Sequence, residues 1–206
     1  MNSSHPLSPN RTIALVSIAI FIGAMDLTVA SAFLPQVVVD FELNTQQFAL
    51  AGWVVTMYLA AYAVSMTFAG RLSDLYGRRV AYLVCLGIFI VGSLLVAVTR
   101  TSGLPFTFAL EWLVASRIVQ ALGAGAMVPV SMALVGDLFP TERRATPLGF
   151  IAAIDTAGWV VGHLYGGIMI RLFTDWRIIF WINIPIGLIT FALCYRALRN
   201  LPDTKV

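Results

Sequence analysis

The 206-residue chain contains very few charged residues. Asp, Glu, Lys and Arg make up 11% of it, and 59% of its residues are hydrophobic. A soluble domain carries about a quarter charged residues to cover its surface, so this composition excludes a typical soluble fold and indicates a membrane protein. The 13 basic residues are not clustered on one segment, as a nucleic-acid-binding face would require. We therefore expect a lipid bilayer, and no nucleic acid, as a partner.

Cysteine and histidine are also scarce, with two of each. Cys85 and Cys194 both lie in apolar stretches, where a disulfide is not expected. The chain lacks a G-x-S-G motif followed by a partner histidine, so an intramembrane protease is not expected. The sequence thus predicts no enzyme, no metal ion and no organic cofactor.

Long apolar segments are abundant instead. A helix needs about 20 predominantly apolar residues to cross the hydrocarbon core of a bilayer, and six segments meet this requirement once a single acidic residue is tolerated in two of them. The predicted spans are residues 12–34, 49–69, 80–98, 106–134, 147–169 and 178–198. We expect one all-α integral membrane bundle over residues 1–206.

The basic residues predict how this bundle is oriented. Short cytoplasmic loops carry an excess of Lys and Arg. With both termini cytoplasmic, nine basic residues fall inside and three outside. The inner nine are Arg11, Arg71, Arg78, Arg79, Arg143, Arg144, Arg196, Arg199 and Lys205; the outer three are Arg100, Arg171 and Arg177. We expect a multi-pass protein of the cell (plasma or inner) membrane with both termini in the cytoplasm.

A short internal similarity divides the spans into two triplets. The segment Gly70-Arg71-Leu72-Ser73-Asp74 follows the second span, and Ile170-Arg171-Leu172-Phe173-Thr174-Asp175 follows the fifth. Three spans separate the two segments, so they lie on opposite sides of the membrane. This arrangement predicts a 3+3 inverted repeat, as in secondary transporters.

Three charged residues lie deep within the predicted spans, away from their ends: Asp26, Arg117 and Asp155. Each charged group near the bilayer centre costs about 2.5–3.5 kcal/mol on insertion scales. Asp26 and Arg117 lie at similar depth on the first span of each triplet, so we expect them to pair and to face one polar cavity. Gln120 continues the Arg117 stripe at helical spacing. The group either marks an ion or substrate path or is a structural pair that holds helices together.

The fifth predicted span carries a row of glycines. Gly158, Gly162 and Gly166 recur every four residues and Gly167 follows, which predicts close packing against a neighbouring helix. Asp155 lies almost on the same stripe.

The loop after the second span has a distinctive pattern. We expect Gly70 and Gly77 to permit a tight turn between antiparallel helices. We expect Asp74 to pair with Arg78 or Arg79, or to lie at a helix N-terminus.

This loop resembles the signature of the major facilitator superfamily, G-x-L-a-D-x-x-G-R-[KR]. It matches at Gly70, Leu72, Asp74, Gly77, Arg78 and Arg79. Leu113-x-x-x-Arg117-x-x-Gln120-x-x-Gly123-x-Gly125 resembles a second family motif, whose arginine is implicated in proton coupling. The segment beginning at Met25-Asp26 resembles a motif of the drug:proton antiporter branches, and the segment beginning at Trp176-Arg177 resembles one typical of the fourteen-helix drug-exporter branch. The chain as a whole most resembles this fourteen-helix drug:proton antiporter branch.

The fifth span departs from the family pattern. The antiporter signature reads G-x-x-x-G-P-x-x-G-G, and here His163 stands where proline is expected. Histidine can serve as a proton shuttle, so His163 either assists proton movement or hydrogen-bonds a neighbouring helix.

The resemblance implies one N-terminal half of a transporter. It implies that Asp74 and Arg78 form a charge network with Asp137, which stabilises one inward- or outward-facing state. The leading hypothesis is proton-coupled efflux of drugs or other amphipathic small molecules, with the proton as coupling ion. The alternatives are proton symport of a polar metabolite, or a non-transporting remnant or assembly partner. The second six-helix half would be a missing C-terminal part, a separate chain or a second copy.

Overall fold

The computed structural model describes residues 8–44, 48–100 and 105–199, and the elements it contains there are all helical. Six helices are long and apolar enough to cross a membrane, which confirms the predicted all-α membrane fold. The elements are α1 (Pro9–Asp40), α2 (Phe48–Tyr76), α3 (Arg78–Ala97), α4 (Phe106–Leu138), the 3-10 turn η1 (Thr141–Arg143), α5 (Ala145–Leu172) and α6 (Arg177–Leu198). Lys205, counted among the inner basic residues, lies outside the described residues.

The helices differ in length. α1 has 32 residues and α4 has 33, which at 1.5 Å per residue gives about 50 Å. The hydrocarbon core is about 30 Å thick, so these two helices extend beyond it. α3, with 20 residues, matches the core closely.

Most predicted helix ends lie within four residues of the observed ones, and the C-terminal ends of α1 and α2 differ by more. α1 continues past Pro35 to Asp40, because a proline inside a helix removes only one backbone hydrogen bond and a packed helix absorbs that loss. α2 continues through Gly70 to Tyr76, so the predicted turn at Gly70 is wrong. The chain reverses at Gly77 alone, whose φ of 88° lies in the left-handed region that glycine adopts freely.

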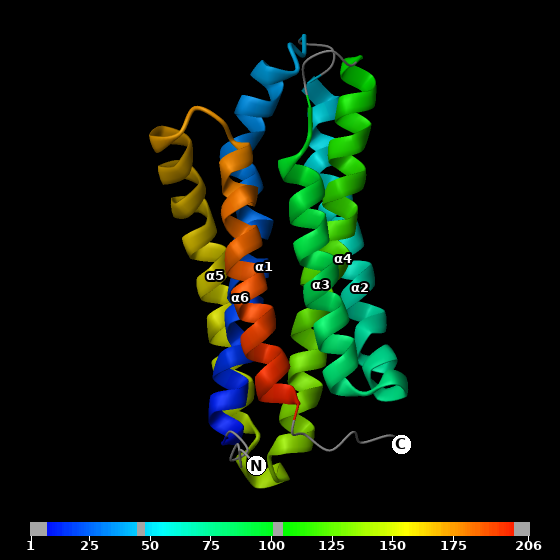
Figure 1. The fold of residues 1–206 in the computed structure, drawn as a ribbon, viewed down its shortest axis with the longest axis vertical. Coiled ribbons are helices and arrows are strands. Elements are labelled where there is room, and N and C mark those ends of the chain that lie inside the picture. Colours follow the sequence, from blue (N-terminus) through cyan, green and yellow to red (C-terminus); the bar gives the residue numbers. More distant parts are fainter. Residues whose placement is uncertain (1–7, 45–47, 101–104, 200–206) are drawn as a thin grey trace.

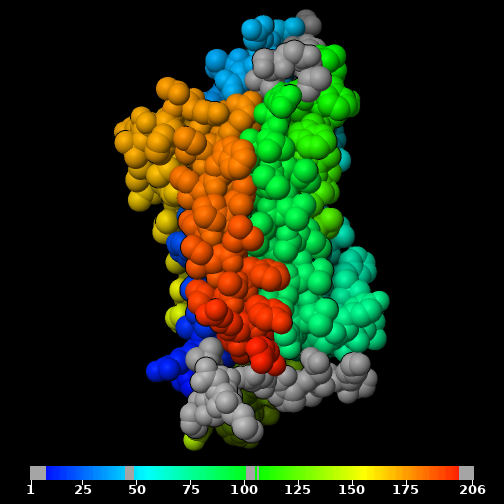
Figure 2. All heavy atoms as spheres, in the orientation of Figure 1, coloured from blue at the N-terminus to red at the C-terminus, as the bar shows by residue number. Residues whose placement is uncertain are grey.

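The inverted repeat is visible in how the helices pack. α1, the first helix of one triplet, packs most extensively against α5, the second helix of the other. α4 packs in the same way against α2. Figure 1 shows these two pairs on either side of the bundle, with α3 and α6 between them in front. Figure 2 shows α6 beside α3 on one face of the molecule, where α6 hides most of α1.

Glycines bring α5 close to α1. A Cβ added at Gly158 or Gly166 would lie 2.7 Å from the Cβ of an α1 alanine, and one at Gly162 would meet Thr28 Oγ1. Such distances are too short for real side chains, so the two backbones approach closely only because these positions are glycine. Gly167 has open space around its Cα. Its predicted place in the packing motif is therefore wrong.

The two ends of the bundle are distinct. α1 begins and α6 ends at the same end, at the bottom of Figure 1, together with the α2–α3 turn and η1. We call this the N-terminal end and the opposite one the far end. Asp26 and Arg117 lie between them, in the middle of α1 and α4.

Candidate functional site

Asp26 of α1 and Arg117 of α4 form an ion pair inside the bundle. Arg117 Nη1 lies 2.5 Å from Asp26 Oδ2, and both side chains are 0% exposed. Arg117 Nη2 also donates to the backbone carbonyl of Asp26, at 3.4 Å. The pair therefore joins the first helices of the two triplets away from solvent.

Aromatic rings surround the Arg117 guanidinium. The ring of Tyr58 on α2 lies 3.9 Å from Arg117 Cζ, and the rings of Phe33 and Phe180 lie 5.7 and 5.6 Å from it. A cation within about 6 Å of an aromatic face is attracted by the ring quadrupole. These rings compensate part of the cost of burying the arginine, in addition to Asp26.

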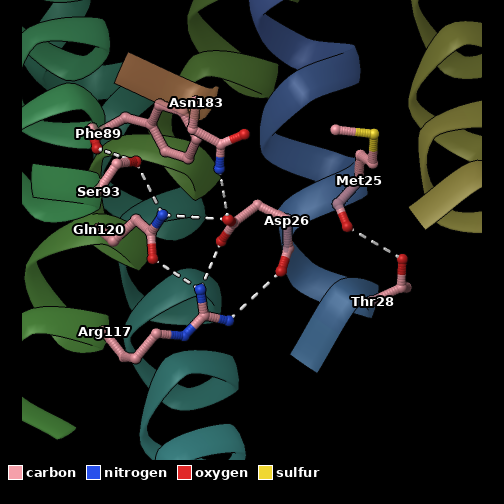
Figure 3. A network of polar contacts seen from close by, with 8 residues as sticks. All are labelled: Met25, Asp26, Thr28, Phe89, Ser93, Arg117, Gln120 and Asn183. Atoms are coloured by element: carbon pink, nitrogen blue, oxygen red, sulfur yellow. Dashed lines mark hydrogen bonds and ion pairs between the residues drawn. The ribbon is translucent and has the colours of Figure 1, made fainter. Parts of the chain in front are cut away.

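Two amide side chains complete the coordination of the carboxylate (Figure 3). Asp26 Oδ1 accepts hydrogen bonds from Gln120 Nε2 at 3.1 Å and from Asn183 Nδ2 at 2.9 Å. Gln120 Oε1 accepts from Arg117 Nη1 at 2.6 Å, and its Nε2 also donates to Ser93 Oγ at 2.9 Å. The Asp26 carboxylate of α1 thus accepts hydrogen bonds from three side chains of α4 and α6, and α3 joins the network through Ser93.

The pair does not line an open cavity, contrary to our expectation. The stripe on α4 that was expected to face a cavity is buried in the bundle, with Gln120 and Ser131 both 0% exposed. A cavity of about 760 Å³ lies instead at the N-terminal end, lined by residues that include Asn10, Phe139 and Glu142. The polar side of α4 faces inward because its partners from α1, α3 and α6 converge on it, which sequence spacing alone does not reveal.

Asp155 and His163 of α5 lie apart from this network. Asp155 is half-buried, and its Oδ1 has no hydrogen-bond partner among the described residues. His163 is exposed, and its Nδ1 lies 3.1 Å from the Trp159 carbonyl on its own helix.

The loop after α2 forms a second polar cluster, at the N-terminal end. Arg78 forms ion pairs with Asp74, one turn before it, and with Asp137 near the end of α4, where Nε lies 3.1 Å from Oδ2. Its Nη1 also donates to Ser73 Oγ. Arg79 points elsewhere, since its Nη1 donates to the backbone carbonyl of Arg199, at 3.3 Å.

A matching cluster lies at the far end. Arg177 Nη1 lies 3.1 Å from Asp40 Oδ2, at the end of α1, and 3.0 Å from Asp175 Oδ1 in the α5–α6 loop. Arg177 Nε donates to the Thr99 carbonyl at 2.7 Å, and Trp176 Nε1 donates to Asp40 at 2.9 Å. This cluster connects the far ends of α1, α3 and α6.

Three residues of the central network were not among the predicted site residues. These residues are Asn183 of α6, Tyr58 of α2 and Ser93 of α3. An amide within an apolar span was a usable signal for Asn183, because polar groups in the bilayer need partners. Ser93 gave no such signal, since serine readily bonds its own helix, as it does here with the Phe89 carbonyl at 2.9 Å.

Comparisons with known proteins identify the family. Residues 16–206 match the sequence model of the Major Facilitator Superfamily. A probable triacylglyceride transporter of Mycobacterium leprae is 36% identical over 86% of this chain and 34% of its own length. A triacylglyceride transporter of Mycobacterium tuberculosis strain H37Rv is 34% identical over 89% of this chain and 35% of its own. The chain thus spans about a third of the length of these curated relatives.

The fold is also that of solved transporters. The proton:xylose symporter XylE bound to 6-bromo-6-deoxy-D-glucose superposes with a TM-score of 0.80 at 17% identity, over 95% of this chain and 45% of XylE. The inward open form of XylE from E. coli gives a TM-score of 0.75 at 18% identity, over 95% and 48% of the two chains. At such identities the likeness concerns the fold alone. Fold, family model and relatives agree that this chain belongs to the major facilitator superfamily of membrane transporters.

Proposed function

We propose that this chain forms the N-terminal bundle of a proton-coupled transporter in which Asp26 binds the coupling proton. The observation that carries the proposal is the fully buried Asp26–Arg117 ion pair between α1 and α4. Replacing a buried ion pair by apolar residues is often neutral or stabilising. Helix packing alone therefore does not require charged residues here.

Proton binding at Asp26 would change the forces between the two triplets. A protonated Asp26 no longer neutralises Arg117, which then lies buried with one neutral amide, a backbone carbonyl and three aromatic rings around it. An unneutralised buried charge raises the free energy of the observed packing. Protonation of Asp26 therefore favours a different packing of α1 against α4. Such repacking is what alternating access between inward- and outward-facing states needs.

The substrate we propose is an amphipathic or lipid-like molecule moved outward. The names of the mycobacterial relatives, triacylglyceride transporters, favour a lipid. The resemblance of the segments around Asp26 and Trp176 to drug:proton antiporters favours export. We propose that the protein lies in the cell membrane. The excess of basic residues at the N-terminal end of the bundle supports an orientation in which that end faces the cytoplasm.

A second six-helix bundle completes this transporter. The long sides of α2 and α5 are largely exposed and apolar, as expected of surfaces covered by another bundle. We propose that the bundle follows in the same polypeptide, with a separate chain or a second copy as the alternatives. A blue-native gel of the expressed protein separates these, and a lone monomer without substrate binding would favour a non-transporting remnant.

One observation favours a second function, proton symport of a polar metabolite. His163 replaces the proline of the antiporter signature, and α5 runs without a break from Ala145 to Leu172. The direction of substrate movement relative to an imposed proton gradient decides between export and symport.

The test uses the transporter assembled from this chain and its second bundle, in membrane vesicles with an imposed pH gradient. Ethidium and a fluorescent triacylglycerol analogue serve as probes. We expect Asp26→Asn to abolish gradient-driven movement while the amount of inserted protein stays unchanged. Asp175→Asn, in the partly exposed far-end cluster, is the matched control and should retain movement. Undiminished transport by Asp26→Asn would refute the role of Asp26.

A further inference from the structure

Asn183 differs from Gln120, the other amide side chain that contacts Asp26, because the oxygen of the Asn183 amide has no hydrogen-bond partner among the described residues. Its Nδ2 donates to Asp26 Oδ1, while its Oδ1 is buried without a hydrogen-bond partner among the described residues. A charged carboxylate can only accept hydrogen bonds, which sets the orientation of the amide in this state. The residue itself is 1% exposed.

Gln120, the other amide side chain at the site, cannot rotate so as to exchange the positions of its nitrogen and oxygen. The Ser93 hydroxyl donates to the Phe89 carbonyl, so Ser93 Oγ accepts from Gln120 Nε2. Gln120 Oε1 in turn accepts from Arg117, which can only donate. Both ends of the Gln120 amide are therefore fixed by groups other than Asp26 (Figure 3).

Protonation gives Asp26 a hydrogen that needs an acceptor. The ionisable groups around it are Arg117 of α4, Tyr58 of α2 and Tyr165 of α5, while α6 contributes Asn183, which does not titrate. Arg117 and the Gln120 amide nitrogen only donate. The Tyr58 hydroxyl is an available oxygen, but a phenol oxygen is a poorer acceptor than an amide carbonyl. Asn183 Oδ1, two bonds from the nitrogen that already contacts Asp26, is the better acceptor.

We propose that Asn183 is a two-way hydrogen-bond partner of Asp26: its amide donates to the carboxylate and turns over to accept from the carboxylic acid. This inference rests on the proposed function, since it requires Asp26 to take up a proton. The proton adds to Asp26 Oδ1, forming an O–H bond, and leaves by the reverse step. Asn183 exchanges one hydrogen bond for another and gains or loses no proton.

The exchange suits a closely packed site. The nitrogen and oxygen ends of an amide are nearly indistinguishable in outline, so the two orientations occupy nearly the same space. In the observed orientation the oxygen that points away from Asp26 has no partner among the described residues, so the rotation breaks no hydrogen bond other than the one to Asp26. Asn183 thereby acts as a positioning residue that satisfies both protonation states of Asp26.

Infrared difference spectroscopy of the assembled transporter, between acidic and alkaline pH, tests this exchange. We expect a carboxylic C=O band that Asp26→Asn removes, together with a paired shift of an amide carbonyl band. Asn183→Leu should remove the amide pair. Thr190→Val should retain it, because Thr190 is buried on the same helix but donates to its own Ile186 carbonyl at 2.8 Å.

The outcomes separate this inference from the proposed function. An amide pair that persists in Asn183→Leu, or is absent from the parent protein while the Asp26 band is present, overturns the role of Asn183 and leaves proton binding intact. Absence of any titrating Asp26 band overturns both. If Asn183→Leu does not fold, Asn183→Ser removes the same amide with a smaller side chain and gives the same test.

Discussion

Arg78 and Arg177 make equivalent contacts at opposite ends of the bundle. Each arginine joins a carboxylate that closely precedes it in the sequence to a carboxylate near the end of the first helix of the other triplet. These carboxylates are Asp74 and Asp137 for Arg78, and Asp175 and Asp40 for Arg177. The short sequence similarity between the two segments thus corresponds to a shared arrangement of charges, related by the inverted repeat.

Arg177→Ala is expected to loosen the far end of the bundle. It removes two ion pairs and the hydrogen bond to the Thr99 carbonyl, which together should cost about 1–3 kcal/mol of unfolding free energy. Arg171→Ala, at an exposed position of the same region, is the control. Thermal unfolding in detergent should show a lower Tm only for Arg177→Ala, and equal Tm values would contradict a stabilising role.

A double-mutant cycle at the central pair should show strong coupling. Arg117→Leu leaves Asp26 buried without its counterion, which typically costs about 3–5 kcal/mol. Adding Asp26→Asn removes the unneutralised charge and should restore most of that loss. The measurement is Tm and yield of folded protein for both single variants and the double variant. Additive effects of the two changes would mean that the ion pair has little energetic weight.

The glycine stripe on α5 predicts a contrast between neighbouring positions. Gly162→Ala introduces a Cβ against Thr28 Oγ1 and the α1 backbone, and overpacking of this kind costs about 1–3 kcal/mol. Gly167→Ala meets open space and should be neutral or slightly stabilising. Tm values of the two variants check this, and a similar loss at both positions would refute the assignment of the α1–α5 contact.

The signature loop predicts a second contrast. Gly77→Ala forces a φ of 88° on a residue with a Cβ, which costs about 1–2 kcal/mol. Gly70→Ala lies within α2 in open space and should stabilise the helix by about 0.5–1 kcal/mol. Chemical or thermal unfolding distinguishes them. Destabilisation by Gly70→Ala in the isolated bundle would indicate a turn at that residue.

His163→Gln should leave the pH dependence of transport unchanged. His163 is exposed, and its Nδ1 lies within hydrogen-bonding distance of the Trp159 carbonyl, which also accepts from Thr28 at 2.9 Å. The side chain is thus engaged with its own helix and lies outside the Asp26 network. The pH profile of vesicle transport is the readout, and a shifted midpoint would assign the histidine a part in proton movement.

Much of the central site followed from the cost of charge in a bilayer. Asp26 and Arg117 were expected to pair because neither is tolerated alone, and the structure brings them together. Tyr58 and Ser93 could not be assigned in this way, because tyrosine and serine occur in spans for several reasons, and the amide of Asn183 indicated a buried partner without indicating which one. Their convergence depends on which helices are neighbours.

The amino-acid sequence by itself determined the solvent, the number of crossings and the repeat. Hydropathy and the spacing of Arg and Gly can be read from short stretches of sequence. Hydropathy predicts the membrane spans directly, because a bilayer requires apolar helices of a fixed length. Only the tertiary structure decided which way the polar side of α4 faces, where α2 ends and which atoms meet at Asp26. Those outcomes depend on close packing between helices distant in sequence, such as Asn183 of α6 against Asp26 of α1, and no periodicity within one helix encodes its neighbour.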